Sequence, residues 1–106
     1  MREVLTVGSQ LILYLASAEN YVEVHWLENG KTKHSLLRST LSEAEKELAK
    51  QSPAVRRCHN SYIVNLNRAR SFSGNKAGYR IILDGTDFTV PISRKYEKDI
   101  FGYLRH

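Results

Sequence analysis

The fold class is decided by residues 21–38, which read YVEVHWLENGKTKHSLLR. Residues 21–26 alternate between apolar and polar side chains and are rich in β-branched and aromatic residues, a pattern typical of a half-buried strand. Asn29-Gly30 is a strong signal for a two-residue hairpin turn. Residues 31–38 then return as the partner strand, so this stretch predicts an antiparallel β-hairpin.

Further strands are expected on both sides of this hairpin. Residues 4–7 are β-prone, and the apolar run 11–15 is too short for a good helix and favours a buried strand. A polar break at 18–20 separates it from the hairpin. Downstream, the sequence predicts extended or irregular backbone over 56–65, a strand over 69–72, a flexible basic loop over 73–78, and strands over 79–83 and 88–90 around an Asp84-Gly85 hairpin signal. Pro91 is expected at a strand end or a sheet edge.

Two short helices complete the expected fold. Thr40 and Glu43 form a capping-box pattern, in which each side chain satisfies the other residue's free backbone N–H. The helix that follows is predicted to end before Pro53 and to bury one face, made of Leu41, Ala44, Leu48 and Ala49. Ser93 is expected to cap a final helix with an apolar face made of Tyr96, Ile100, Tyr103 and Leu104. The sequence therefore predicts a mainly β domain with roughly five or six short strands.

Length and composition indicate a single globular domain. The chain has 106 residues, of which 42% are hydrophobic and 25% charged, close to ordinary globular usage. Its longest uncharged apolar run, residues 11–16, is too short to span a bilayer, and no N-terminal segment has the order of a secretory signal. A single cysteine excludes an internal disulfide and fits a reducing compartment, so a cytoplasmic location is expected.

The charge distribution suggests an anionic partner. The formal net charge is +5, and the stretch from Arg56 to Arg80 holds six basic residues and no acid. Between Ala16 and Gly30 the charged residues are all glutamates. A basic run fits either a solvated face or a surface for an anionic partner, with nucleic acid ahead of a membrane.

No constellation in the sequence predicts an enzyme or a metal site. Cys58-His59 places a nucleophile beside a base, but adjacent residues of an extended segment point to opposite faces. Cys58 is therefore interpreted as a small core residue and His59 as a surface polar residue. The histidines show no ligand spacing, although His25 and His34 could face each other across the hairpin, and no Gly-rich phosphate loop is present.

The aromatic residues have two interpretations. Tyr14, Trp26, Phe72, Tyr79 and Phe88 all fall in predicted strands, where aromatic side chains usually belong to the core. A sheet that stacks nucleic-acid bases would instead need several of them on one solvent face.

Residues 57–65, which read RCHNSYIVN, resemble the signature of the LytTR family of bacterial DNA-binding domains. Two other segments agree with it. Residues 12–15 and 20–24, ILYL and NYVEV, resemble a second family motif, and residues 90–96, VPISRKY, resemble a third, in which a proline precedes a Ser-Arg pair and an aromatic residue. The motifs match in order and spacing over about the whole chain.

The resemblance implies an elongated, mainly β fold of small antiparallel sheets packed side by side with small helices. Domains of this family sit at the C-terminus of response regulators and of some membrane-attached regulators. They bind DNA through loops at one edge, which reach successive major grooves and bend the duplex, unlike a recognition helix laid in one groove.

The resemblance also implies site residues. By position, the base-contacting residues are Asn20, Asn60 and Arg94. The chemistry is consistent, since arginine can donate two hydrogen bonds to guanine and asparagine can pair with adenine. The expected phosphate contacts are Arg57, His59, Ser61, Ser93 and Lys95. Taken without the resemblance, Asn20 reads as a turn residue, Asn60 as a local turn cap and Arg94 as a surface charge.

The chain also departs from the family pattern. Asn60 stands where a basic residue is commoner, so that contact is expected to be weaker or different. Ala16-Ser17 replaces the acidic residue often found after the Tyr14 strand, and the family's first strand is cut short at Met1, which suggests an excised domain.

The sequence thus predicts one domain over residues 1–106, taken from the C-terminal part of a larger bacterial regulator of a two-component system. The predicted function is sequence-specific binding of double-stranded DNA, with no catalysis, metal or cofactor. A second copy on a repeated site stays open as a partner, and no small-molecule substrate or membrane contact is expected. The alternative is a β-rich protein-interaction module with a basic face.

Overall fold

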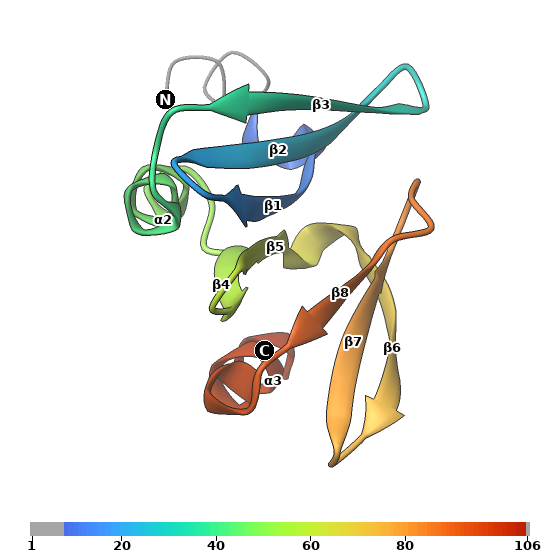
Figure 1. Ribbon diagram of the computed structural model, residues 1–106. Helices are drawn as coiled ribbons and strands as arrows, with labels where there is room; N and C mark the ends of the chain where they lie inside the picture. Colours follow the sequence, from blue (N-terminus) through green and yellow to red (C-terminus); the bar gives the residue numbers. More distant parts are fainter. Residues whose placement is uncertain (1–7, 106) are drawn as a thin grey trace.

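Two antiparallel sheets and two short α-helices make up the computed structural model, which describes residues 8–105 (Figure 1). The strands are β1 (Ile12–Ala18), β2 (Tyr21–Glu28), β3 (Lys31–Leu37), β4 (Val55–His59), β5 (Tyr62–Asn65), β6 (Ala69–Asn75), β7 (Gly78–Leu83) and β8 (Thr89–Ile92). The helices are α2 (Leu41–Ala49) and α3 (Glu97–Leu104), with short 3-10 turns η1 (Ser9–Leu11), η2 (Leu66–Arg68) and η3 (Arg94–Tyr96). The predicted mainly β class is confirmed, whereas the strand expected over 4–7 lies outside the described residues.

The first sheet has the strand order β3-β2-β1-β5-β4 and the second the order β6-β7-β8. Pro91 lies in β8, an edge strand of the second sheet, where its missing N–H costs no ladder hydrogen bond. The domain measures 36 × 28 × 26 Å along its principal axes, so it is elongated only modestly.

The β2–β3 hairpin forms where the sequence predicts it. Asn29 and Gly30 have φ values of 54° and 78°, and both central residues of a type I′ turn need positive φ. Glu28 therefore pairs with Lys31 and the register continues to Val22 opposite Leu37.

Residues 56–65, expected to be extended or irregular, form the extended strands β4 and β5, joined by a tight turn at Asn60-Ser61. Strand β5 also pairs with the distant strand β1. The expectation of a flexible loop over 73–78 is wrong, because these residues form the end of the β6–β7 hairpin. Gly74 has a φ of +95°, and a Cβ at this position would lie 2.0 Å from the Gly78 carbonyl oxygen. The glycine reflects a close backbone approach within a hairpin, which its composition alone does not distinguish from a loop.

Helix α2 covers one face of the first sheet (Figure 1). Thr40 and Glu43 form the predicted capping box, with the Glu43 N–H donating to Thr40 Oγ1 at 3.1 Å. The cluster beneath the helix consists of Ile12, Leu15, Val22, Val24, Leu37, Leu41, Ala44, Leu48, Val55 and Ile63. Ala49 is exposed, contrary to expectation, because it lies about 80° around the helix from Leu41 at 100° per residue.

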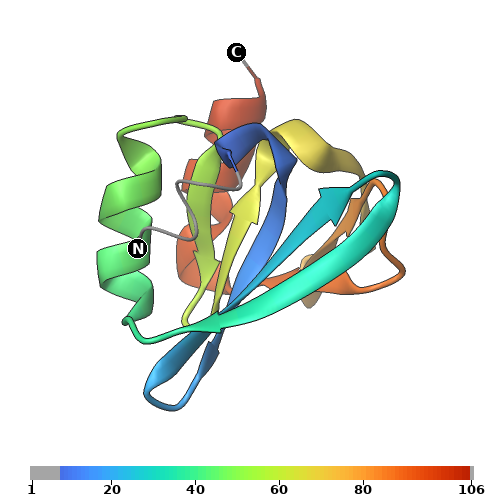
Figure 2. The same ribbon diagram turned by 90° about the horizontal axis from the view of Figure 1, so that it is seen from above.

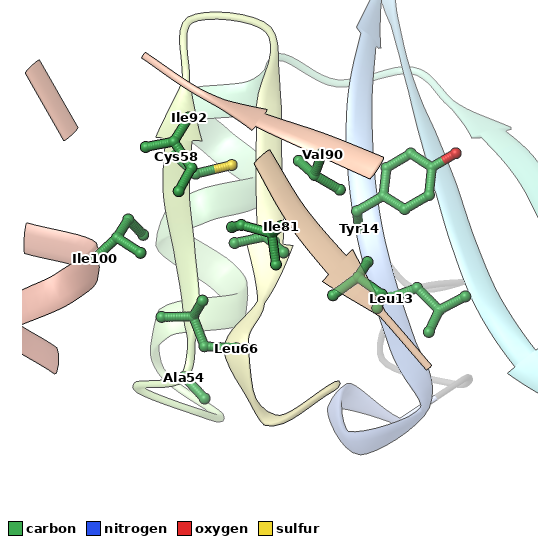
Figure 3. Packing of buried hydrophobic residues seen from close by; sticks show 11 residues of the cluster. Leu13, Tyr14, Ala54, Cys58, Leu66, Ile81, Val90, Ile92 and Ile100 are labelled. Carbon is green, nitrogen blue, oxygen red and sulfur yellow. The ribbon is translucent and has the colours of Figure 1, made fainter. Parts of the chain in front are cut away.

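A second core joins the two sheets and α3 (Figure 3). Its buried members are Leu13, Tyr14, Ala54, Cys58, Val64, Leu66, Ile81, Leu83, Val90, Ile92 and Ile100. From α3, Ile100 is fully buried, while Leu104 is 39% exposed and Phe101 packs against the cluster in its place. Leu104, expected on the apolar face of this helix, therefore lies outside the core.

The turns between strands lie at two opposite ends of the first sheet. The tips of the β2–β3 and β7–β8 hairpins meet, since a Cβ on Gly85 would lie 2.6 Å from Leu27 Cδ2. The β1–β2 and β4–β5 turns lie at the other end of the first sheet, where Ala16 pairs with Tyr62. None of the helices within residues 8–105 is long and apolar enough to cross a membrane.

Cys58 is a core residue, as expected. Its side chain is fully buried, its Sγ lies 3.7 Å from the Tyr62 carbonyl oxygen, and burial raises the pKa of the thiol from 9.0 to about 12. We expect Cys58→Ala to lower the free energy of unfolding by about 1 kcal/mol and to leave unchanged the affinity for DNA, the partner that the sequence predicts. Urea denaturation and a duplex titration measure the two effects. A tenfold loss of affinity with the fold preserved would contradict this.

Alkaline pH should destabilise the domain. The unfolded Cys58 thiol ionises near its ordinary pKa of 9.0, whereas the native thiol keeps its proton up to about 12, so stability falls as the pH rises through this window. Burial, and secondarily the charge of Glu23, likewise raises the pKa of Tyr14 from 10.0 to about 12. Denaturant midpoints between pH 8 and 11 test this, and Cys58→Ala should retain only the later part of the loss. Identical profiles for the two proteins would exclude the thiol as a cause.

Candidate nucleic-acid interface

Segments from three distant parts of the chain meet at one edge of the molecule. The Ser17 N–H of β1 donates to the Ser61 carbonyl at 2.9 Å, which joins the β1–β2 turn to the β4–β5 turn. The Ser93 N–H donates to the Cys58 carbonyl, also at 2.9 Å, which brings the segment after β8 to the same place. We call residues 19–20, 59–61 and 93–95 the turn edge. It contains seven of the eight predicted site residues, and Arg57 adjoins it.

The β1–β2 turn is a short projection. Ala18 pairs with Tyr21, so Glu19 and Asn20 alone form the turn, which extends beyond the end of the sheet (Figure 2). Both are exposed, and no partner of the Asn20 side chain occurs within residues 8–105. Glu19 has a φ of 57°, in the left-handed region that residues other than glycine and asparagine seldom adopt. Asn20 is thus a turn residue whose amide is free to contact a partner.

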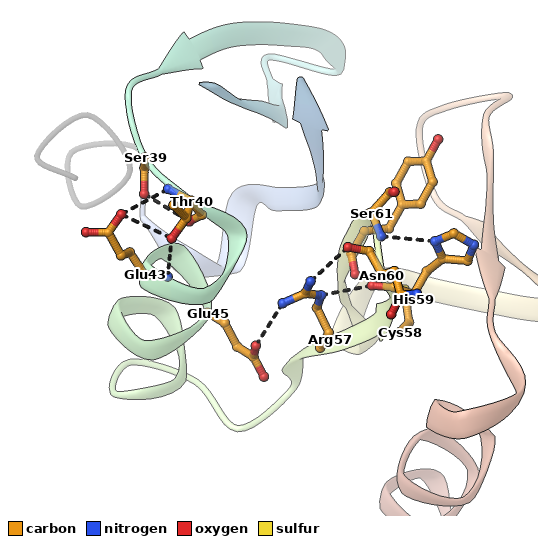
Figure 4. Close-up of polar contacts among 10 residues, drawn as sticks. Ser39, Thr40, Glu43, Glu45, Arg57, Cys58, His59, Asn60 and Ser61 are labelled. Atoms are coloured by element: carbon orange, nitrogen blue, oxygen red, sulfur yellow. Dashed lines mark hydrogen bonds and ion pairs between the residues drawn. The ribbon is translucent and has the colours of Figure 1, made fainter. Parts of the chain in front are cut away.

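The β4–β5 turn is held in shape by Arg57 (Figure 4). The Arg57 Nε donates to the His59 carbonyl at 2.9 Å, and Nη2 donates to the Asn60 carbonyl at 2.8 Å. The third nitrogen, Nη1, lies 3.4 Å from Glu45 Oε1 on α2. The Ser61 N–H donates to His59 Nδ1 at 3.0 Å. The turn therefore presents the exposed Asn60 side chain from a backbone that is braced on both sides.

These contacts change the expected position of Arg57. Its side chain is only 17% exposed and each guanidinium nitrogen has a partner, so it lies behind the turn and not on its outer face. Sequence reasoning missed Glu45. Nothing distinguishes this carboxylate from the other acids of α2 until the helix is packed beside β4.

The third segment begins at Ser93. Its Oγ is buried and has no hydrogen-bond partner within the described residues, so the predicted side-chain cap of the final helix does not form. Arg94 and Lys95 follow in η3, and both are exposed. Lys95 Nζ lies 5.1 Å from the centre of the Tyr96 ring, and neither cation has an ion-pair partner among residues 8–105. Both charges are therefore available on the turn edge.

The basic stretch between Arg56 and Arg80 is mostly occupied by internal contacts. Arg56 pairs with Asp99 at 2.7 Å and lies over the Tyr103 ring at 4.5 Å. The other arginines contact protein groups as well: Arg57 contacts Glu45, Arg68 the Gln10 carbonyl, Arg70 Asp84, and Arg80 Thr89. The five arginines of this stretch therefore stabilise the fold through contacts that the sequence does not reveal. Lys76 differs from them because no such contact of its side chain occurs within residues 8–105.

Aromatic side chains cross the first sheet in a stacked row. Tyr14 stacks on His25 with ring centres 4.2 Å apart and on Phe88 at 4.8 Å, and His25 stacks on His34 at 5.6 Å. Tyr14 is buried and Phe88 is 36% exposed, with its ring against Tyr14 and Tyr62. Because Tyr14 is buried and both neighbouring rings stack on it, the core interpretation of Tyr14 is confirmed.

The histidines contact nearby side chains and do not form a metal or catalytic site within residues 8–105. His25 and His34 do face each other across the hairpin, and His25 Nε2 lies 2.5 Å from Glu23 Oε1. Within residues 8–105, no group of three or more His, Cys, Asp and Glu side chains is arranged to hold a metal ion. His59 bonds to Ser61, whereas the Cys58 thiol faces the core, so the two neighbours do not form a nucleophile–base pair.

Comparisons with known proteins show the family and the fold of this chain. The chain matches the family model of the LytTr DNA-binding domain over residues 2–105. A similar solved structure is the LytTr DNA-binding domain of a Bacillus cereus protein described as a methyl-accepting/DNA response regulator. It is 22% identical, has a TM-score of 0.73, and the match covers 89% of this chain and 84% of that chain. No curated protein shows significant similarity. The structural likeness at this identity shows the shared fold, and the family match over nearly the whole sequence shows that the chain belongs to the LytTR family of DNA-binding domains.

Proposed function

We propose that this domain binds double-stranded DNA sequence-specifically, as the DNA-binding part of a bacterial transcriptional regulator, through the turn edge. One observation carries the proposal: backbone hydrogen bonds hold the segments of three sequence motifs side by side, each with an exposed polar residue at its tip. Membership of a DNA-binding family supports DNA as the partner. We propose no catalytic role and no cofactor.

Asn20, Asn60 and Arg94 are the proposed base-reading residues. Each is exposed on the turn edge, and no side-chain partner occurs for any of them within the described part of the chain. An asparagine amide can pair with the N6 and N7 atoms of adenine, and an arginine fork with O6 and N7 of guanine. Because the three side chains come from separate segments, we propose that they read separate base pairs.

The resemblance to the family implies contacts in successive major grooves, and separate turns suit such contacts. Asn20, Asn60 and Arg94 come from three different segments of the chain, so they can approach the duplex at different places. Turns are narrower than a helix and can enter a groove without displacing the rest of the domain. We propose that the turn edge follows the duplex in this way.

The remaining site residues have two proposed roles. Lys95, the Ser61 hydroxyl and His59 contact phosphates. Because His59 Nδ1 accepts from the Ser61 N–H, the neutral ring carries its proton on Nε2, which remains as a donor. We propose that Arg57 and Ser93 act by positioning, since the Arg57 guanidinium is occupied inside the turn and the Ser93 Oγ is buried while its N–H bonds to Cys58.

A selection from a random duplex pool tests this function. The expected result is an enriched sequence with at least two conserved positions in separate grooves, bound far more tightly than a scrambled duplex. Paired copies of the sequence at a constant spacing would support a second copy of the domain on a repeated site. The alternative function, a protein-interaction module with a basic face, predicts no enriched sequence and only weak, nonspecific attraction to DNA.

Salt dependence supplies an independent prediction. Two to four neutralised phosphates should give a slope of about −2 to −4 for log affinity against log salt concentration, because each phosphate contact releases condensed counterions. Fluorescence anisotropy with the selected duplex at several salt concentrations measures the slope. A slope near zero would contradict binding to the DNA backbone.

A further inference from the structure

We infer that the DNA-binding surface extends from the turn edge onto the second sheet, where Lys76 at the tip of the β6–β7 hairpin binds the phosphate backbone beside Arg94. This inference rests on the proposed function and adds a contact that none of the three sequence motifs contains. The occupant of the site is a phosphodiester of the bound duplex.

The first support is that the Lys76 side chain has no polar contact with another group among residues 8–105. The five arginines of the same acid-free stretch each contact a protein group, as described above. Lys76 is exposed, and no hydrogen bond, ion pair or ring contact of its side chain occurs within residues 8–105. Its ammonium group is therefore available to a partner without breaking any contact of the fold.

The second support is its place in the fold. In the second sheet, Asn75 pairs with Gly78 at the hairpin tip, and Tyr79 pairs with Ile92, the last residue of β8. The chain passes from Ile92 directly into Ser93 and Arg94. The hairpin tip and the base-reading arginine thus lie at the same end of the sheet, opposite the β7–β8 tip (Figure 1).

The two cations line one groove. A groove of about 410 Å³ is lined by Lys76, Tyr79, Arg94, Glu97 and Phe101. Its side-chain charges are two positive and one negative, so the groove has a net positive charge. An anion that enters beside Arg94 would meet Lys76 on the neighbouring wall, and a duplex that receives Arg94 in a groove places its backbone on both sides of that side chain.

The hairpin tip is held in a defined position. Gly74 lies too close to Gly78 for any side chain, and the Asn75 Oδ1 accepts from the Ala77 N–H at 2.9 Å. Below the tip, Phe101 of α3 packs on Tyr79 and on Phe72, with ring centres 5.2 Å apart in both pairs. The same helix follows η3, which carries Arg94, so Lys76 and Arg94 are positioned by one packed unit.

Lysine chemistry decides what this contact does. An ammonium group is a point charge without the planar fork that reads a guanine edge. Lys76 should therefore add affinity to every duplex equally and leave base preferences unchanged.

Lys76→Ala tests the inference, with Lys33→Ala as the matched control. Lys33 is also an exposed lysine of a hairpin, but it lies in β3 opposite Trp26, towards the tip at the other end of the first sheet. The probes are the selected duplex and a scrambled duplex of equal length. We expect Lys76→Ala to weaken both by about threefold to tenfold and to make the salt slope shallower by about one unit, with Lys33→Ala like the unchanged protein.

Lys76→Arg should retain the affinity, because it keeps the charge. If the unchanged protein selects a site and Lys76→Ala binds it with the same affinity and slope, the inference is overturned while the proposed function stands. Equal losses in Lys76→Ala and Lys33→Ala would also overturn it, since they would reflect net charge alone. If the unchanged protein shows no preference between the two duplexes, the proposed function fails.

Discussion

Arg94→Ala is expected to reduce affinity for the selected duplex by about 1–3 kcal/mol, which is up to about a hundredfold, and to relax the choice of one base pair. Arg94 is exposed in η3, immediately after a residue whose backbone N–H is bonded to Cys58. The side chain thus leaves a fixed backbone, which favours insertion at a constant place in the groove. Removal of the guanidinium leaves the guanine edge without its paired donors.

The neighbouring lysine is the matched control for this result. Lys95 is exposed in the same turn and carries the same charge without a planar fork. Lys95→Ala should weaken all duplexes alike and reduce the salt slope by about one unit, without a change in base preference. Asn20→Ala should relax a different base pair, because its turn comes from a separate segment.

The measurement is the affinity of each variant for the selected duplex and for every single-base substitution of it. An equal loss on all duplexes for Arg94→Ala would make Arg94 a phosphate contact. An unchanged affinity, with the fold preserved by circular dichroism, would place the DNA-binding surface elsewhere on the molecule.

The second large effect is expected for Arg57→Ala. The substitution removes charge-assisted hydrogen bonds to the His59 and Asn60 carbonyls, which lie at 2.9 and 2.8 Å. We expect the free energy of unfolding to fall by about 1.5–3 kcal/mol, the range for hydrogen bonds to charged groups. We also expect weaker discrimination at the base pair read by Asn60, because the turn that carries it loses its brace.

Arg57→Lys separates positioning from direct phosphate binding. A lysine keeps the charge but cannot bridge two carbonyls and a carboxylate with one planar group. If Arg57 positions the turn, Arg57→Lys should lose discrimination as Arg57→Ala does, and the salt slope should stay the same in both. Glu45→Gln should have a smaller effect, since the partly exposed ion pair contributes about 0–1 kcal/mol. Full recovery of discrimination by Arg57→Lys would show that the charge acts directly on a phosphate.

Some features of this protein depend on interactions between residues that are close in the sequence, and the sequence alone therefore predicts them. Asn29-Gly30 sets the β2–β3 turn, because these residue types tolerate the positive φ that the turn needs. The start of α2 is set by Thr40 and Glu43, which are three residues apart. The family motifs, with Asn20, Asn60 and Arg94, were likewise recognisable as sequence patterns.

Other features depend on residues that only the fold brings together. Strand β5 pairs with its neighbour β4 and also with β1, roughly fifty positions earlier, and the second pairing places β5 and β4 in the first sheet. Arg56 donates a hydrogen bond to Asp99, 43 positions away in the sequence, and Arg68 donates one to the Gln10 carbonyl, 58 positions away. The sequence could not reveal that these two arginines have partners within the protein, because free and paired arginines look the same until their partners are placed.

The assembly of the site also belongs to the tertiary structure. Residue types and motif order indicated the segments that we propose to contact DNA, but two backbone hydrogen bonds, Ser17–Ser61 and Ser93–Cys58, place them at one edge. The role of Arg57 behind its turn and the position of Lys76 beside Arg94 follow from that assembly. The physical reason is the distance along the chain over which each interaction acts. Turn and helix signals involve residues a few positions apart, whereas sheet pairing and ion pairs join residues that are close in space but distant in sequence.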